Sequence, residues 1–266
     1  MSVLDDILAA KRDEVTLLHQ PQARDAIRTA ALAAPPTRDF VGALRHDDQL
    51  AVIAEFKRRS PSKGDLAPDL DPAITALAYA GGGAAALSVL TDRLFFGGSV
   101  EDLRVARAAA PATPALRKDF TIDADQVYES RAIGADAVLL IVAAVPDPGE
   151  LADLHALAVE LGLGVLIEAH DDAELDVALG VGARVVGVNA RNLGTFAEDL
   201  GVAERLAARI PADVVAVAES AIRSLDDARR VAAVGFDAIL VGEALVRAED
   251  PSRLVSALAA TPRTRR

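Results

Sequence analysis

Residues 50–57 read Leu-Ala-Val-Ile-Ala-Glu-Phe-Lys, a short apolar run that ends in two charged residues. Such a run is typical of a strand buried on both faces. Side chains two positions apart on a strand point to the same face, so Glu55 and Lys57 share the inward face of Ile53. A buried charge costs several kcal/mol unless it is paired or used chemically. Two interpretations remain here: a structural ion pair, or part of a functional site.

The residues that follow predict a turn and then a loop. Residues 60–64, Ser-Pro-Ser-Lys-Gly, combine residue types that favour turns, and Pro61 prevents the strand from continuing. We expect the loop 58–69 to close over a site at the strand end and exclude water from it.

From residue 50 onward the chain alternates apolar runs with amphipathic stretches. We expect strands at 50–57, 85–90, 114–118, 137–142, 164–168, 184–189, 213–219 and 238–242. We expect helices near 71–80, 99–109, 123–133, 147–161, 171–179, 199–209, 224–234 and 251–260, and many of them open with a capping Asp or Ser. Eight such units in 266 residues predict an α/β fold, a closed (β/α)8 TIM barrel.

A doubly wound open sheet is the structural alternative. Such a sheet usually carries a glycine-rich dinucleotide-binding turn after its first strand, and residues 57–61, Lys-Arg-Arg-Ser-Pro, contain no glycine. The Gly162-x-Gly164 and Gly180-x-Gly182 pairs precede strands and lack the third glycine, so we interpret them as helix-to-strand turns. The barrel is the better prediction.

Residues 1–49 precede the first barrel strand and predict a helical extension. Leu4, Ile7, Leu8, Lys11 and Val15 have the spacing of one helix face, and a second short helix is expected at 40–44 after two prolines. No linker rich in Gly, Ser or Pro separates this part. We therefore expect a single domain over residues 1–266, with 1–49 packed on the barrel and covering one mouth.

The composition narrows the class of protein. The chain has no cysteine, which excludes disulfides, thiolate metal sites and cysteine nucleophiles. Its net charge of −12 argues against nucleic acid as a partner. No apolar run approaches a membrane span of roughly 20 residues, and the acidic N-terminus is unlike a signal peptide, so we expect a cytoplasmic protein. An anionic small molecule remains a possible substrate, because basic residues cluster near strand ends: Lys57, Arg58, Arg59, Lys63, Arg117 and Lys118.

Polar side chains end the apolar runs of six predicted strands. In a barrel these ends meet at one mouth, where the active site lies. Three carboxylates and two lysines there would perturb one another's pKa values, as acid–base chemistry requires. The residues are Glu55, Lys57, Lys118, Glu168, Asn189, Arg191, Glu219, Ser220 and Gly242.

The histidines and the loops after the last two strands bear on metal and phosphate binding. No two of the four histidines have metal-binding spacing, so we expect no metal site, and we interpret His170 as a solvated loop residue. The short loops that contain Ser220 and Gly242 fall where barrels commonly bind phosphate through backbone N–H groups.

In this order, these residues closely resemble the indole-3-glycerol phosphate synthase family of tryptophan biosynthesis. The resemblance spans nearly the whole chain and lies in the segments 4–12, 53–64, 87–92, 95–99, 116–120, 166–168, 187–193 and 218–220. It implies that 1-(2-carboxyphenylamino)-1-deoxyribulose 5-phosphate closes a ring and then loses CO2 and water, with no cofactor or metal.

The resemblance also implies residue roles. Lys118 is the general acid at the substrate carbonyl, Glu168 the base or charge stabiliser, and Lys57 the partner of the substrate carboxylate, tuned by Glu55. Asn189 and Glu219 line the pocket beside Arg191. The phosphate is assigned to Lys57, Ser60, Ser220, Ala221, Gly242 and Glu243, and the apolar walls to Pro61, Phe96, Phe120, Leu139 and Leu240.

Two positions depart from the family pattern. Ala221 replaces the usual glycine after Glu-Ser, and we expect it to keep an ordinary backbone conformation with its N–H facing the phosphate. Phe56 is bulkier than the usual aliphatic residue, and strand alternation points it into the helix layer.

Three other functions stay open. They are a phosphosugar isomerase of the same pathway, a synthase that forms a Schiff base on Lys118, and a barrel kept as a non-catalytic scaffold. A Schiff-base lysine needs a depressed pKa, whereas Lys118 is expected near carboxylates. We expect a monomer or a weak homo-oligomer.

Overall fold

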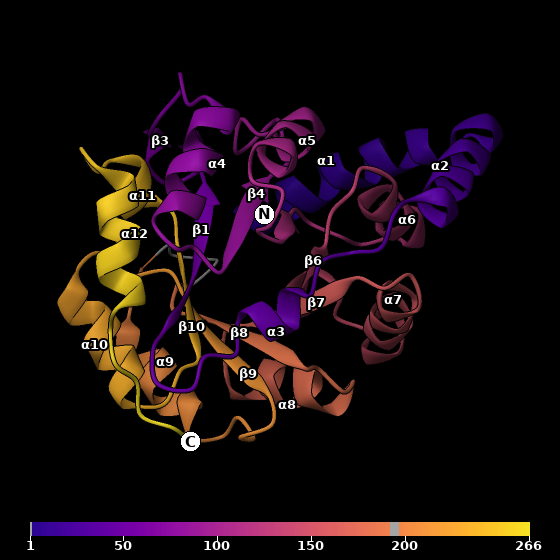
Figure 1. Ribbon diagram of the computed structural model, residues 1–266. Helices are drawn as coiled ribbons and strands as arrows, with labels where there is room; N and C mark the ends of the chain where they lie inside the picture. Colours follow the sequence, from indigo (N-terminus) through magenta and orange to yellow (C-terminus); the bar gives the residue numbers. More distant parts are fainter. Residues whose placement is uncertain (1, 192–196) are drawn as a thin grey trace.

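A closed barrel of eight parallel strands forms the centre of the molecule (Figure 1). The computed structural model describes residues 2–191 and 197–266. Strand β1 pairs with both β4 and β10, which closes the sheet and confirms the predicted (β/α)8 fold. Asn192 and Leu193, the end of one family-like motif, lie outside the described residues. The barrel strands are β1 (Ala51–Phe56), β4 (Ala86–Leu90), β5 (Ala115–Lys118), β6 (Ala137–Ile141), β7 (Gly164–Ala169), β8 (Val185–Asn189), β9 (Val215–Glu219) and β10 (Ala238–Val241).

Eight helices in the described part of the chain follow the strands and surround the barrel (Figure 1). Their first turns are capped as the sequence predicts, since the side chains of Asp71, Ser99, Asp123, Asp171, Ser224 and Asp250 each accept a backbone N–H. The helices are α4 (Pro72–Gly81), α5 (Val100–Ala109), α6 (Ala124–Ala132), α7 (Pro148–Glu160), α8 (Asp172–Gly180), α9 (Leu200–Ala207), α10 (Leu225–Ala233) and α12 (Pro251–Ala259).

The residues before β1 form three helices: α1 (Val3–Leu18), α2 (Pro21–Ala33) and α3 (Phe40–Ala43). The expected stripe of α1 is buried at Ile7, Leu8, Lys11 and Val15. Helix α3 places Phe40 beside Gly164, the first residue of β7, and so fills the end of the barrel where the strands begin. Helix α2 packs along α6. Helix α2 was not predicted, because its inward stripe of Ala23, Ile27 and Ala31 is short and mostly alanine, and only Ala31 is fully buried.

Three shorter elements were also unpredicted. The loop after β1 contains a small hairpin of β2 (Arg59–Ser60) and β3 (Gly64–Asp65). A 3-10 turn, η1 (Val142–Ala144), follows β6, and α11 (Glu243–Val246) follows β10. Each is too short to carry a periodic signal. All three follow the carboxyl ends of strands, and the hairpin and α11 shape the site described below.

Strand alternation divides the apolar core into two layers. Val52, Ala54 and Phe56 of β1 face the surrounding helices, where the Phe56 and Tyr79 rings meet edge to face with centroids 5.3 Å apart. Phe56 thus points into the helix layer, as expected. Ala51 and Ile53 face the barrel interior, and so does Glu55, the next residue of that row. No helix in the described part of the chain is long and apolar enough to cross a membrane.

Candidate functional site

A cavity of about 450 Å³ lies at the carboxyl ends of the barrel strands. Every residue that the sequence singled out for the site lines this cavity, although lining it does not by itself test any role. The six acid–base candidates are Glu55, Lys57, Lys118, Glu168, Asn189 and Glu219. The other predicted residues are Ser60, Pro61, Phe96, Phe120, Leu139, Arg191, Ser220, Ala221, Leu240, Gly242 and Glu243.

The charged centre of the cavity is built around Lys118 at the end of β5. Its Nζ lies 3.0 Å from Oε2 of Glu168 on β7 and 3.3 Å from Oε2 of Glu219 on β9. Asn189 of β8 donates to the other oxygen of Glu168 over 3.0 Å. Each group comes from a different strand, so the closed sheet brings together residues distant in sequence.

A second pair lies beside this centre. Nζ of Lys57 is 3.3 Å from Oε1 of Glu55. The same Nζ lies 5.9 Å from the ring centroid of Phe96, within reach of a cation–π contact. The ion pair that the sequence left as one interpretation therefore exists, and it faces the cavity.

Burial and charge move the pKa values of the central groups in different directions. Burial alone would lower the pKa of Lys118, but the carboxylates of Glu168, Glu219 and Glu55 outweigh it and raise that pKa. Burial opposes ionisation of Glu168, yet Lys118, His170 and Asn189 hold its pKa well below the ordinary value. For Glu219, burial and the charges of Glu168 and Glu55 exceed the pull of Lys118 and raise the pKa to about 8.

These shifts assign protonation states near pH 7. Lys118 is an ammonium paired with an ionised Glu168, whereas Glu219 keeps its proton. The cavity therefore holds a charged donor, a charged acceptor and a neutral acid within one cluster. This is the combination that proton transfer in both directions needs.

Two glycines give the buried glutamates room. A Cβ at Gly187, in the middle of β8, would overlap the carboxylate of Glu219. A Cβ at Gly242 would lie 2.6 Å from Oε1 of Glu55. The sequence analysis missed Gly187, although a glycine inside an otherwise valine-rich strand signals close approach of another group.

The turn after β9 corrects one expectation. Ser220 and Ala221 both have positive φ, 64° and 58°. The expectation that Ala221 keeps an ordinary conformation is therefore wrong, and the alanine is held in the left-handed region that favours glycine. Such a conformation costs alanine about 1 kcal/mol. The neighbours that impose it, β9 and the loop before α10, come from the fold and not from the local sequence.

The basic residues near the strand ends divide into two groups. Lys57, Lys63 and Lys118 line the cavity, as expected, and Arg191, Arg223 and Arg247 join them. The remaining three turn away from it: Arg58 pairs with Asp102, Arg59 donates to backbone carbonyls of Arg93 and Leu94, and Arg117 lies buried against Asp119 and Glu129. Of these six lining residues, Arg223 and Arg247 were missed, because they lie four and six residues beyond the ends of β9 and β10 and so outside the strand-end positions that the sequence singles out.

Loop residues tie several of the lining cations together. Glu198 pairs with both Arg191 and Arg223, and Arg191 also donates to Oγ of Ser62 over 2.8 Å. Lys63 lies 2.7 Å from Glu243. Ser62 and Lys63 belong to the turn of the β2–β3 hairpin, so that turn is attached to the opposite rim of the cavity.

The apolar side of the cavity is formed by aromatic residues and by α1. The rings of Phe96 and Phe120 lie 6.1 Å apart. Val3, Leu4 and Ile7 of α1 also line the cavity, which places the extension at the mouth, as expected. The sequence predicted that one face of α1 packs on the barrel, but it did not identify Val3, Leu4 and Ile7 as residues of the pocket wall.

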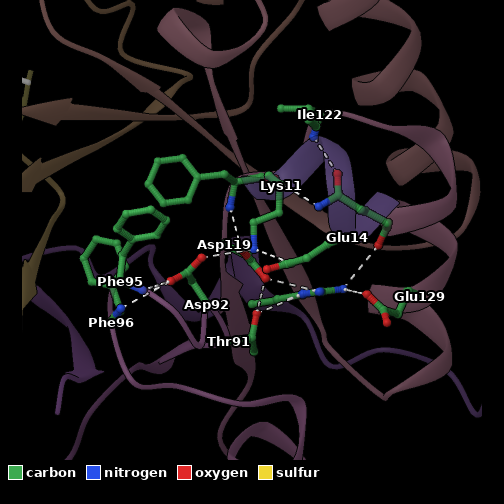
Figure 2. Close-up of polar contacts among 12 residues, drawn as sticks. Lys11, Glu14, Thr91, Asp92, Phe95, Phe96, Asp119, Ile122 and Glu129 are labelled. Carbon is green, nitrogen blue, oxygen red and sulfur yellow. Dashed lines mark hydrogen bonds and ion pairs between the residues drawn. The ribbon is translucent and has the colours of Figure 1, made fainter. Parts of the chain in front are cut away.

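A buried lysine fastens α1 to this wall (Figure 2). Lys11 is only 1% exposed. Its Nζ lies 2.9 Å from Oδ1 of Asp119 and 3.1 Å from Oδ2 of Asp92. Asp119 stands between Lys118 and Phe120. Asp92 accepts the backbone N–H of Phe95 over 2.8 Å and of Phe96 over 3.2 Å. One cation from the extension therefore holds the two chain segments that carry the aromatic wall.

His170 differs from its expected state. It is not a solvated loop residue: its side chain is 11% exposed and lies between Glu168 and Glu174. Burial alone would lower the pKa of the imidazole, but these two carboxylates raise it to about 10. The sequence analysis placed His170 after strand five but had no local signal for the direction of its ring.

One group of three side chains has a spacing that would suit a metal ion among the described residues: His19, Asp123 and Asp125. It does not line the cavity. Arg24 and Arg28 both pair with Asp125, at 2.9 Å each, so two guanidinium groups already offset its charge. A divalent cation there would be repelled by the same arginines.

The comparisons with known proteins agree with this geometry. A family profile described as indole-3-glycerol phosphate synthase matches residues 4–258. The chain is 47% identical over 239 residues to the indole-3-glycerol phosphate synthase of Arthrobacter sp. (strain FB24), which covers 88% of this chain and 87% of that protein. It is 53% identical over 225 residues to the protein of the same name from Aromatoleum aromaticum, covering 83% of this chain and 84% of the other.

Solved structures give the same fold at low sequence identity. A 3-hexulose-6-phosphate synthase from Salmonella typhimurium superimposes with a TM-score of 0.62 at 16% identity, over 79% of this chain and 97% of that one. A thiamine phosphate pyrophosphorylase from Pyrococcus furiosus gives 0.59 at 19% identity, over 79% and 93%. At these identities the likeness concerns the barrel alone.

Proposed function

The chain belongs to the indole-3-glycerol phosphate synthase family, and from that premise we propose how its cavity residues carry out the family's reaction. The enzyme is a carboxy-lyase of tryptophan biosynthesis. It converts 1-(2-carboxyphenylamino)-1-deoxyribulose 5-phosphate into indole-3-glycerol phosphate by ring closure, decarboxylation and dehydration.

Lys118 is the proposed general acid for ring closure. The ring carbon that bears the carboxylate attacks the substrate ketone, and the ketone oxygen takes a proton from Nζ. The observation that carries this role is the 3.0 Å pair between Lys118 and Glu168, which keeps the amine protonated at the centre of the cavity. A charged donor aimed at a developing oxyanion lowers the barrier most where water is excluded.

Glu168 is the proposed base, and Lys57 the proposed partner of the substrate carboxylate. After CO2 leaves, the hydroxyl departs as water with a proton, and a proton is lost from the neighbouring carbon to complete the indole. Glu168 is ionised and oriented by Asn189, so it suits the removal of a proton or the stabilisation of positive charge on the anilino nitrogen. Lys57, held by Glu55, supplies the acid for dehydration.

The two anionic ends of the substrate suit different parts of the cavity. The phosphate is proposed to bind at the ends of β9 and β10, to backbone N–H groups of Ser220, Ala221, Gly242 and Glu243 and to Ser60, while Lys57, also considered for the phosphate from the sequence, serves the carboxylate. The carboxylate of Glu243 itself is engaged by Lys63 and Arg247, which leaves the main chain of that residue for the phosphate. The anthranilate ring then packs among Pro61, Phe96, Phe120, Leu139 and Leu240, with Arg191 adding positive charge nearby.

Replacement of Lys118 tests the central assignment. We expect Lys118→Ala to lower kcat by about 10²–10⁴-fold, the usual contribution of a general acid. Formation of indole-3-glycerol phosphate can be followed by indole fluorescence, because the chain contains no tryptophan to mask it. Arg104→Ala, on the outer helix α5, is the control. A Lys118→Ala variant with wild-type turnover would contradict the assignment.

A Schiff-base mechanism on Lys118 is the competing proposal. It needs a neutral amine, and the raised pKa of Lys118 favours the ammonium instead. Borohydride reduction in the presence of substrate separates the two. We expect no mass increase on Lys118, whereas covalent capture there would favour the Schiff base. A non-catalytic scaffold is less well supported, since an idle cavity has no reason to keep three buried glutamates.

We also propose that residues 1–266 act as one domain in the cytoplasm, with 1–49 as its helical extension. The contacts of α1 with the cavity wall support a single unit. The acidic surface, with a net charge of −12, disfavours nucleic acid as a partner and leaves the anionic small substrate to the local basic groups. A monomer or weak homo-oligomer is proposed, which sedimentation would test.

A further inference from the structure

His170 links the proposed base to the helix layer outside the barrel. Its Nε2 lies 3.3 Å from Oε1 of Glu168, and its Nδ1 lies 2.8 Å from Oε2 of Glu174 on α8. The same Glu174 oxygen accepts the backbone N–H of His170 over 2.8 Å. The ring is thus hydrogen-bonded to Glu174 on one side and lies at ion-pair distance from Glu168, without a hydrogen bond from Nε2, on the other. Its position follows from the start of α8.

We propose that His170 is a positioning residue that, as an imidazolium held by Glu174, fixes the Glu168 carboxylate and keeps it ionised for the reaction. This inference rests on the proposed role of Glu168 as the base. It adds a group that does not line the cavity and that the family resemblance did not assign.

The contacts of Glu168 explain why a second cation matters. Its Oε2 faces Lys118 of β5, while its Oε1 receives the Asn189 amide of β8 and faces His170. Glu219 of β9 and Glu55 of β1 compete for the same ammonium of Lys118. Without His170, Glu168 would have only the Lys118 ammonium within ion-pair distance in the described part of the chain, and Glu219 shares that ammonium, so a proton would pass more readily to Glu168.

The charge of His170 follows from its surroundings. The groups that face its ring are Glu168 at the end of β7 and Glu174 on α8, both acidic. These carboxylates raise the pKa of the imidazole to about 10 against the effect of burial. Below that pH both ring nitrogens carry protons, so each can face one carboxylate. A neutral ring could donate to only one of them.

Local hydrogen bonds fix the position of Glu174 within the short segment 170–174. Asp171 caps α8 by accepting the backbone N–H of Glu174 over 2.9 Å. The Glu174 carboxylate in turn accepts the backbone N–H of His170 over 2.8 Å. The segment is therefore closed by reciprocal hydrogen bonds in the manner of a capping box. The helix start fixes Glu174, Glu174 fixes the ring, and the ring fixes Glu168.

The variant His170→Gln separates charge from shape, since glutamine can still donate an N–H toward Glu168 but carries no charge. We expect the acid limb of the kcat/KM profile to move to higher pH by about 1–3 units, because an opposite charge within 4–6 Å has been removed. We expect kcat to fall with little change in KM, since Glu168 acts in the chemical step. His155→Gln, a partly buried histidine on α7, is the matched control and should leave the profile unchanged.

Nitrogen-15 NMR of the four histidines gives a readout that does not depend on activity. In the folded wild type we expect one imidazole, lost in His170→Gln, to remain doubly protonated at pH 8. In Glu174→Gln that ring should lose its proton at a lower pH, and kcat should fall as it does so. Urea unfolding of each variant shows whether it is folded before kinetics are compared.

The outcomes separate this inference from the proposed function. If Glu168→Gln is inactive while the pH profile of His170→Gln overlays the wild type, the inference about His170 is wrong and the role of Glu168 stands. A neutral imidazole at pH 8 would also overturn it. If Glu168→Gln keeps wild-type kcat, the proposed base is wrong, and the inference fails with it.

Discussion

At the scale of single residues, the turn after β9 combines function with strain. Ser220 and Ala221 are two consecutive non-glycine residues with positive φ, at the proposed phosphate site. Within the described chain no other non-glycine residue adopts this conformation. A strained backbone persists only where its surroundings impose it, which here are the strand end and the loop that would contact substrate.

We predict that Ala221→Gly stabilises the protein. Relief of the left-handed conformation gains about 1 kcal/mol, partly offset by the greater freedom of glycine in the unfolded chain, so the net rise in unfolding free energy is about 0.5 kcal/mol. Urea denaturation measures it. Ala67→Gly, in a loop position without positive φ, is the control and should lose stability. A loss at both positions would show that Ala221 is not strained.

Gly187 provides a second residue-scale prediction. A methyl group there would overlap the Glu219 carboxylate, so Gly187→Ala should displace Glu219 and lower kcat at least as much as Glu219→Gln. Gly180→Ala is the control, since no atom lies near the position of its Cβ and φ is ordinary. Steady-state kinetics compare the variants. Equal activity of Gly187→Ala and wild type would mean that Glu219 needs no fixed position.

Single residues also show which features of the site the local sequence can predict. The rule that i and i+2 share a strand face placed Glu55, Lys57 and the other strand-end charges at one cavity. It could not give the direction of His170 or the backbone of Ala221, because both depend on α8 and the β9–α10 loop folded against them. Arg58 and Arg117 were expected among the basic residues of the site but turn away from it for the same reason, since their partners Asp102 and Glu129 lie on helices.

At the scale of elements, α1 is both a cover and an anchored part of the site. Its Val3, Leu4 and Ile7 line the cavity, and Lys11, further along the helix on the same side, is buried between Asp92 and Asp119. Burial alone would lower the pKa of Lys11, but these carboxylates and Glu14 raise it, so the helix docks through a charged group.

We predict that Lys11→Met lowers the unfolding free energy by about 3–5 kcal/mol, because it removes the cation that pairs with the buried Asp92 and leaves Asp119 with Arg117 alone. Since Asp92 and Asp119 carry the segments of Phe96 and Phe120, KM should rise in whatever fraction stays folded. Arg12→Met, one residue away on the exposed face of α1, is the control. Urea unfolding measures the loss of stability, and steady-state kinetics measure KM. An unchanged KM would show that the docking of α1 through Lys11 does not position the aromatic wall of the pocket.

Elements also differ in how well the sequence predicts them. The eight barrel helices carry caps and apolar faces that the sequence shows, and all were found near their expected positions. The inward stripe of α2 is short and mostly alanine, and the β2–β3 hairpin has two residues per strand, so neither gives a strong periodic signal. Both contribute long-range contacts, α2 to α6 and the hairpin turn to Arg191 and Glu243.

At the scale of the whole molecule, the closed sheet explains why a dispersed set of charges makes one site. Glu55, Lys118, Glu168, Asn189 and Glu219 lie far apart in sequence, yet each ends a strand of the same barrel. Parallel closure sends all these ends to one mouth. The count and polarity of the apolar runs therefore predicted both fold and site location, while the pairings within the site required the folded geometry.

The positions of the two chain ends have a practical consequence for attaching the enzyme to another body. Ser2 caps α1, and the next residues, Val3 and Leu4, already line the cavity, so a partner joined there would emerge beside the mouth. Arg263 and Arg266 instead pair with Asp237, which precedes β10 at the far end of the barrel (Figure 1). For immobilisation on a support, or fusion to a second enzyme, attachment after Arg266 keeps the entrance open to the medium.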